Sequence, residues 1–181
     1  MKLTKVQYSK ELLNNIENLY NNAFPKNERK PFDLILEKCQ NNQMEILAVT
    51  EDDGRFLGLA ITIVYSDIVI LDYFAISPNH RGKNIGSEAL QHIFNIYKGK
   101  RLLLEIEDPE VESTNNIERI RRKAFYLKNN MTVMPYKINL FDVQMEVLTY
   151  NCFVSFDDYH SVFENVFDKS IADKIKLLCI N

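Results

Sequence analysis

Residues 69–90, VILDYFAISPNHRGKNIGSEAL, decide how this chain folds and suggest what it holds. An apolar strand passes through a proline turn into a basic loop, and a helix begins at that loop. The first amide N–H groups of a helix have no intrahelical partner, and the helix dipole adds about half a positive charge there. Because Arg81 and Lys83 add side-chain charge, and Gly82 and Gly86 let the backbone approach a ligand closely, the loop predicts a cradle for phosphate or pyrophosphate.

The loop differs from two common phosphate-binding loops. Gly86 is followed by Ser87 rather than by a Gly-Lys-Ser/Thr run, which excludes a P-loop. Gly82 and Gly86 also lack the three-glycine spacing of a dinucleotide-binding turn. Short loops with glycine, asparagine and basic residues are common as solvated turns, so the assignment depends on a second motif downstream.

Composition limits the class of protein. The chain has 181 residues, of which 46% are hydrophobic and 26% charged, and this predicts a single domain over residues 1–181. Its net charge of −3 argues against nucleic acid as a partner, since nucleic-acid binders are normally basic. The sequence contains no apolar run of about 20 residues, so we expect no membrane partner. The amino-terminal residues lack the apolar stretch of a secretory signal.

Cysteine and histidine are few and scattered. Cys39, Cys152 and Cys179 are widely spaced and odd in number, which indicates neither a disulfide framework nor a metal knuckle. The three histidines show no metal-ligand spacing either. We therefore predict a cytoplasmic protein with no bound metal.

Hydrophobic periodicity and turn residues predict a mixed α/β chain. Ser9 is the expected N-cap of the first helix. The strand, basic loop, helix and strand over 68–107 form a βαβ unit, which normally gives a right-handed parallel crossover. The expected strands are 2–6, 44–50, 55–65, 68–76, 101–107, 133–140 and 143–150, and the expected helices are 9–23, 32–39, 85–97, 117–129 and one or two over 156–178.

The second motif is RRKAFYLKNNM at residues 121–131, and with it the chain resembles the GNAT superfamily of N-acetyltransferases. The family's acetyl-CoA loop reads Arg/Gln-x-x-Gly-x-Gly/Ala directly after its fourth strand. Arg81 and Gly86 match this pattern, and Asn84 stands at the central glycine. Asparagine tolerates the left-handed backbone conformation better than most residues, so the replacement is a mild one.

The downstream helix resembles the family's Phe-Tyr motif, which is present as Phe125-Tyr126. The Gly-Phe pair that usually follows four residues beyond the tyrosine appears as Asn130-Met131. An asparagine that is common seven residues before the tyrosine is replaced by Arg119. The resemblance covers residues 1–150 as a family core and leaves 151–181 outside it as a helical C-terminal extension.

The resemblance implies a mixed α/β (α+β) fold, in which a central, mostly antiparallel sheet is splayed between its fourth and fifth strands and flanked by helices. It also implies acetyl-CoA as the co-substrate, with the pantetheine arm lying along the fourth strand as a form of β-augmentation. The backbone of Phe74 and Ile76 would pair with pantetheine amides, and the Ile76 N–H would polarise the thioester carbonyl. The implied contacts are Phe74, Ala75, Ile76, Arg81, Gly82, Lys83, Asn84, Ile85, Gly86 and Ser87.

Acetyl transfer to an amine requires two proton movements. By resemblance, Tyr126 is the general acid that protonates the leaving thiolate. The base is open between Asp72 on the fourth strand and either Glu105 or Glu107 on the fifth. Glu105 and Glu107 point to one face of the strand, and the alternative is that they are solvated strand charges. The implied acceptor contacts are Glu28, Arg29 and Glu107.

The resulting hypothesis is an N-acetyltransferase that moves the acetyl group to a primary amine of a small molecule or protein by direct transfer in a ternary complex. No cysteine or serine is indicated as a covalent acyl carrier. Three alternatives stay open: transfer of a longer acyl group, a CoA-binding regulatory module with weak chemistry, and an unrelated nucleotide-binding protein, which would need a Mg²⁺ ligand that is not evident. The acceptor, and whether the chain is a monomer or a homodimer, are also open.

Overall fold

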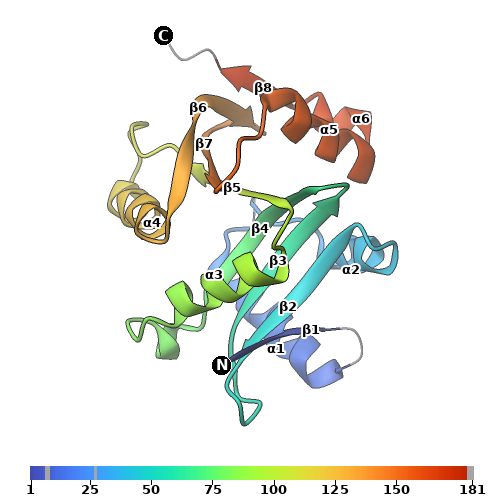
Figure 1. The fold of residues 1–181 in the computed structure, drawn as a ribbon, viewed down its shortest axis with the longest axis vertical. Helices are drawn as coiled ribbons and strands as arrows, with labels where there is room; N and C mark the ends of the chain where they lie inside the picture. The colour runs from blue at the N-terminus through green and yellow to red at the C-terminus, as the bar shows by residue number, and fades with distance from the viewer. Residues whose placement is uncertain (7–8, 27, 179–181) are drawn as a thin grey trace. The chain divides into compact units, whose positions relative to one another are not determined.

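The computed structural model describes residues 1–6, 9–26 and 28–178. Helices and strands are mixed along the chain (Figure 1). In chain order the elements are β1 (Lys2–Lys5), α1 (Lys10–Ala23), α2 (Phe32–Gln40), β2 (Met44–Thr50), β3 (Phe56–Tyr65), β4 (Ile68–Ile76), the 3₁₀ turn η1 (Pro78–His80), α3 (Ile85–Ile96), β5 (Arg101–Glu107), α4 (Asn116–Lys128), β6 (Met131–Leu140), β7 (Val143–Tyr150), α5 (Phe156–Val166), α6 (Lys169–Ala172) and β8 (Ile175–Leu178).

The eight strands pair in the order β1-β2-β3-β4-β5-β7-β6-β8. The pairing is mostly antiparallel, and β4 and β5 pair in parallel through Ile68–Ile70 and Arg101–Leu103. Helix α3 connects these two strands, as the βαβ prediction requires. The predicted mixed, mostly antiparallel fold with flanking helices is therefore confirmed.

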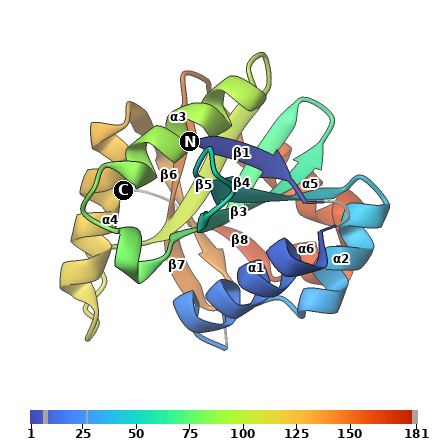
Figure 2. The same cartoon turned by 90° about the horizontal axis from the view of Figure 1, so that it is seen from below.

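The chain divides into two compact units, and the first consists of residues 1–64 and 71–98. Ser9 caps α1 as predicted, because its side chain accepts a hydrogen bond from the Leu12 N–H. Within this unit α3 and the pair α1 and α2 lie on opposite faces of the strands (Figure 2). The α3 face is packed by a core of Val49, Leu57, Ile76 and Ala89.

The second unit consists of residues 65–70 and the chain from Gly99 onward. Helix α4 contacts β5 and β6, and α5 contacts α6. Helix α5 supplies a buried apolar face made of Tyr159, Val162, Phe163 and Val166. Its N-cap Ser155 accepts a hydrogen bond from the Asp158 N–H.

The end of the C-terminal extension corrects the prediction of helix over 156–178. Helices α5 and α6 form as expected, but Ile175–Leu178 is a strand that pairs antiparallel with Lys137–Leu140 of β6. Apolar residues at 171 and 175 have helical spacing, which explains the wrong prediction. Residues 175–178 form a strand instead of a helix because the outer edge of β6 offers backbone groups that need hydrogen-bond partners.

Gly58 on β3 allows a close approach to β4. A Cβ atom at this position would lie 2.5 Å from the Ala75 carbonyl oxygen and 2.9 Å from the Ile76 Cδ1. Any larger residue would therefore push β3 away from the part of β4 that precedes the basic loop.

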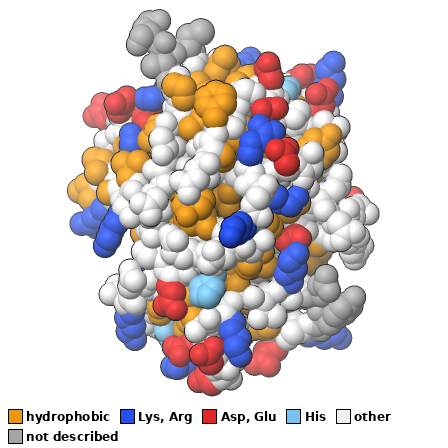
Figure 3. All heavy atoms as spheres, in the orientation of Figure 1, with side chains coloured by type: hydrophobic (Ala, Val, Ile, Leu, Met, Phe, Trp, Pro, Cys, Tyr) orange, Lys and Arg blue, Asp and Glu red, His pale blue; other side chains and the backbone are white. Residues whose placement is uncertain are grey.

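Among the described residues, no helix is long and apolar enough to cross a membrane, and no cluster of three His, Cys, Asp or Glu side chains could hold a metal ion. Acidic and basic side chains are interspersed on the face shown in Figure 3. Cys39 and Cys152 are free thiols.

Candidate functional site

The predicted phosphate loop lies in the first unit, between the end of β4 and the start of α3. The chain leaves β4 with the Ser77 N–H donating to the Leu57 carbonyl (2.8 Å), and η1 then turns it toward Arg81. The Arg81 Nε donates back to the Ile76 carbonyl at 3.0 Å. The loop is therefore anchored to the end of β4 by both backbone and side chain.

Two loop residues take the left-handed conformation that the motif requires. Asn84, at the central glycine position, has φ 61° and ψ 4°, and Gly82 has φ 78°. Asn84 is the N-cap of α3, but its side chain makes no capping hydrogen bond. The amides of the first turn of α3 thus meet the expected geometry of an anion site at a helix start.

Replacement of Asn84 tests this backbone requirement. We expect Asn84→Ala to lower the free energy of unfolding by about 1–2 kcal/mol, because alanine is strained at positive φ. Asn84→Gly restores the residue usual in the family and should leave stability equal or higher. Urea denaturation of the three proteins measures both, and equal midpoints for Ala and Gly would contradict the argument.

Phe74, Ala75 and Ile76 form the end of β4, immediately before the loop. Ile76 belongs to the core under α3, and Phe74 packs against that core. Ala75 and Ile76 are buried, whereas Phe74 is half-buried. The side chains of Phe74 and Ile76 are therefore held in place by packing, which fixes the orientation of their backbone groups.

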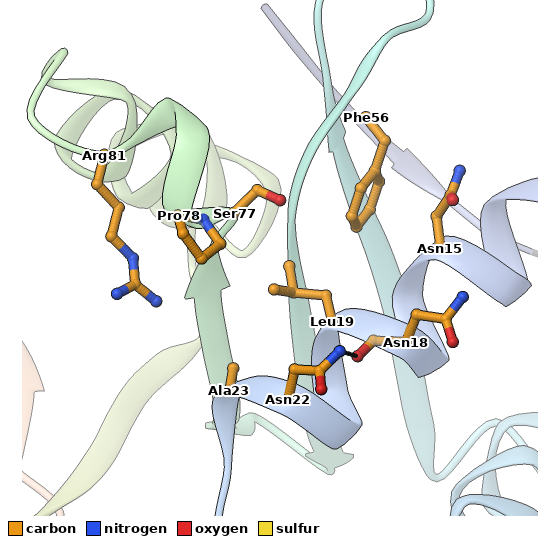
Figure 4. A pocket seen from close by; sticks show the side chains of 9 residues that line it. All are labelled: Asn15, Asn18, Leu19, Asn22, Ala23, Phe56, Ser77, Pro78 and Arg81. Atoms are coloured by element: carbon orange, nitrogen blue, oxygen red, sulfur yellow. Dashed lines mark hydrogen bonds between the residues drawn. The ribbon is translucent and has the colours of Figure 1, made fainter.

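A pocket of about 450 Å³ adjoins the loop within the same unit (Figure 4). Helix α1 contributes one polar face to it, since the three asparagines recur at helical spacing. The Arg81 side chain borders it, and no carboxylate is among its lining residues. The lining consists of Asn15, Asn18, Leu19, Asn22, Ala23, Phe56, Ser77, Pro78 and Arg81.

The loop between α1 and α2, which was predicted to contact the acceptor, is tied to β4 by Tyr73 and to α1 by Tyr20. The Tyr73 hydroxyl donates to the Glu28 carbonyl (3.0 Å) and accepts from the Lys30 N–H (3.0 Å). The Tyr20 hydroxyl donates to the Lys30 carbonyl (3.0 Å). The two rings meet edge to face with centroids 4.8 Å apart. Burial raises the pKa of Tyr20 well above its usual value, so it remains a donor.

The two predicted acceptor residues in this loop differ in their surroundings. Glu28 is exposed. Arg29 is half-buried, and its guanidinium donates to the Asn21 amide oxygen and lies 6.0 Å from the centroid of the Tyr20 ring. Its Nε is buried without a hydrogen-bond partner among the described residues.

Asp72, a candidate base, forms an ion pair with Lys30. The Lys30 Nζ donates to both carboxylate oxygens, at 2.8 and 2.9 Å. The Asp72 side chain is only 9% exposed and that of Lys30 only 20%. The ammonium also lies 5.3 Å from the centroid of the Tyr73 ring. A carboxylate on β4 is thus compensated by a lysine that the sequence analysis did not select.

Tyr126, the candidate acid, lies in the second unit, on the buried side of α4. Burial raises its pKa to about 12, and the nearby Arg122 partly opposes the shift. The phenol therefore keeps its proton at neutral pH. Asn130 follows α4 with φ 64°, which explains why asparagine replaces the usual glycine there.

Glu105, the other candidate base, lies on β5 in the same unit as Tyr126. Its Oε1 accepts a hydrogen bond from the Tyr159 hydroxyl at 2.7 Å. Tyr159 is fully buried on α5, so the C-terminal extension contacts a predicted site residue. This contact links residues 54 positions apart and has no signal in the sequence.

Glu107 is held by two arginines of α4. Its carboxylate lies 2.6 Å from the Arg119 Nη2 and 2.9 Å from the Arg122 Nη1, and its side chain is 9% exposed. The departure from the family pattern at position 119 thus supplies a cation to β5. The predicted role of Glu107 as an acceptor contact remains a prediction.

The phosphate loop, the end of β4, Asp72 and the loop between α1 and α2 all belong to the first unit. Tyr126, Glu105 and Glu107 belong to the second unit. The asparagine face of α1 was not predicted, although its i, i+3, i+7 spacing was a usable signal. Lys30 was not predicted either, because it pairs with a residue 42 positions away and has no local signal.

Comparisons with solved structures show proteins that share the fold of this chain. A solved structure from Bacteroides thetaiotaomicron, assigned to the GNAT family, is 18% identical, with a TM-score of 0.77 over 95% of this chain and 99% of that one. Spermidine N-acetyltransferase from Vibrio cholerae in complex with CoA and spermine is 18% identical, with a TM-score of 0.57 over 81% and 94%. An aminoglycoside 6′-N-acetyltransferase complexed with coenzyme A is 14% identical, with a TM-score of 0.63 over 82% and 96%.

At these identities the solved structures show a shared fold. No curated protein sequence matches the chain. The family model for the acetyltransferase (GNAT) family matches residues 13–121, which is more than half of the chain. This chain therefore belongs to the GNAT acetyltransferase family.

Proposed function

We propose that this protein is an acetyl-CoA-dependent N-acetyltransferase that transfers the acetyl group directly to a primary amine. The observation that carries the proposal is the loop at the start of α3, where Gly82 and Asn84 have positive φ and the helix start is left without a side-chain cap. Membership of the GNAT family and the likeness to structures with bound CoA support it.

The cofactor contacts come from the first unit. Backbone N–H groups of residues 81–87 hold the pyrophosphate, and Arg81 and Lys83 add positive charge. The backbone of Phe74 and Ile76 pairs with the pantetheine amides, with Ala75 between them. The Ile76 N–H stabilises the negative charge that develops on the thioester oxygen. When bound, acetyl-CoA supplies an activated acyl group with a thiolate leaving group.

Proton transfer completes the reaction. An alkylammonium has a pKa near 10, so the amine must lose a proton before it attacks. Asp72 and Glu105 are the proposed acceptors of this proton, directly or through water. Tyr126 gives its proton to the departing thiolate. The acceptor reaches the site past Glu28 and Arg29, and Glu107 is proposed as a further contact.

Calorimetric titration with acetyl-CoA, with ATP and NAD as controls, is the first test. We expect selective binding of acetyl-CoA, followed by amine-dependent thiol release with a panel that includes polyamines and aminoglycosides, the amines named for two of the structural relatives. Equal binding of all three nucleotides would refute the cofactor assignment. Selective binding without turnover would favour the CoA-binding regulatory module. Faster turnover with a longer acyl-CoA than with acetyl-CoA would identify the longer acyl-CoA as the donor.

Three further attributes belong to this proposal. The free thiols of Cys39 and Cys152 suit a reducing compartment, so we place the protein in the cytoplasm. Its partners are acetyl-CoA and an amine, with no role for nucleic acid, membrane or metal. Size-exclusion chromatography with light scattering would decide between a monomer and a homodimer.

A further inference from the structure

The ion pair between Lys30 and Asp72 places an alkylammonium group inside the first unit. Both carboxylate oxygens accept from the same nitrogen, at 2.8 and 2.9 Å, and both side chains are largely withdrawn from water. A primary alkylammonium is also the form in which an amine acceptor exists at neutral pH. The lysine therefore has the same head group as the proposed acceptor.

The position of Asp72 on β4 gives the ion pair a role in the proposed reaction. Asp72 is two residues before Phe74 on the same strand, which corresponds to about 7 Å along the strand. In the proposed function, the backbone of Phe74 binds pantetheine next to the reacting thioester. The carboxylate of Asp72 is thus within the reach of an amine that approaches the acetyl group.

We propose that Asp72 is the ammonium-binding carboxylate of the acceptor site and that Lys30 fills this site in the free protein, so that a cationic amine binds by displacing the lysine. The inference rests on the proposed function, whose substrate class it narrows to amines that bind as cations. Lys30 then acts as an internal competitor that excludes neutral ligands from the carboxylate.

The surroundings of Lys30 permit this exchange without movement of the loop. Its backbone N–H and carbonyl are hydrogen-bonded to Tyr73 and Tyr20, respectively. The side chain can therefore rotate away while the main chain of Lys30 keeps its hydrogen bonds to the two tyrosines. A buried carboxylate without a cation is costly, so the site requires a cation from the ligand whenever the lysine leaves.

Removal of the lysine charge tests the exchange. We expect Lys30→Met to lower the KM for 1,4-diaminobutane about tenfold, which corresponds to about 1.4 kcal/mol, and to leave the KM for acetyl-CoA unchanged. Lys30→Arg keeps a cation on Asp72 and should not lower the amine KM. Lys5→Met is the matched control, because it removes an ion pair with Glu45 (2.6 Å) elsewhere in the same unit.

A second variant separates binding from folding. Lys30→Met leaves Asp72 unpaired, so its urea midpoint should fall, and adding Asp72→Asn should restore the midpoint but abolish the gain in amine affinity. An amine KM that is unchanged in Lys30→Met, or lowered equally in Lys5→Met, would overturn the inference.

Calorimetric titration with diaminobutane in the presence of CoA distinguishes failure of the proposed ammonium site from failure of the proposed function. Tighter diamine binding by Lys30→Met in a protein that turns over no amine would support the ammonium site and refute the transferase. Amine turnover, together with equal diamine binding by the wild type and Lys30→Met, would support the transferase and refute the ammonium site.

Discussion

Tyr126→Phe is expected to lower kcat about 100-fold or more while changing the affinity for acetyl-CoA little. General acid catalysis typically contributes about 10²–10⁴-fold, and phenylalanine removes only the hydroxyl that supplies the proton. The aromatic ring, which meets Phe125 edge to face with centroids 5.1 Å apart, keeps its packing. Steady-state kinetics and calorimetry with acetyl-CoA measure the two effects separately.

The pKa of Tyr126 adds a pH criterion to this prediction. Burial raises the pKa to about 12, so the proton is present throughout the range in which the enzyme would be assayed. Wild-type activity should therefore show no loss from Tyr126 ionisation below about pH 11. Tyr136→Phe is the control, because Tyr136 is a half-buried tyrosine of the same unit whose hydroxyl donates to the Val154 carbonyl (2.9 Å). A kcat for Tyr126→Phe equal to that of this control would remove Tyr126 as the acid.

Local signals predicted much of the fold. The strands Met44–Thr50, Ile68–Ile76, Arg101–Glu107 and Val143–Tyr150 begin and end at the predicted residues. Each is a run of apolar and β-branched residues with a turn or proline nearby, and such signals act over a few positions. The positive φ of Asn84 was predicted as well, because the resemblance placed a glycine there.

Contacts between distant residues could not be predicted in the same way. Whether Asp72 and Glu107 bear uncompensated charge depends on Lys30 and on two arginines of α4, which the fold brings to them. β8 depends on the outer edge of β6, and the four residues Ile175–Leu178 carry no signal of their own for that edge. Pairing of this kind is tertiary, so it overrides local propensity.

Gly86→Glu should have opposite effects on folding and on cofactor binding. Gly86 is the second residue of α3, and a carboxylate in the first turn of a helix interacts favourably with the dipole, by about 0.3–1 kcal/mol. Replacement of glycine within a helix also removes a residue of low helix propensity. Stability against urea should therefore be maintained or increased.

The affinity for CoA should fall about 100-fold or more, because the same carboxylate would face the pyrophosphate. Two like charges about 5 Å apart repel by roughly 3 kcal/mol at the effective dielectric constant of a protein surface. Gly86→Gln has nearly the same shape without the charge, so the difference between the two variants isolates electrostatics from bulk. A similar loss in both would assign the effect to steric exclusion, and unchanged CoA binding in both would mean that the start of α3 does not hold the pyrophosphate. A destabilised fold would lower both the stability against urea and the affinity for CoA. Maintained stability together with weaker CoA binding therefore attributes the loss to the anion site itself.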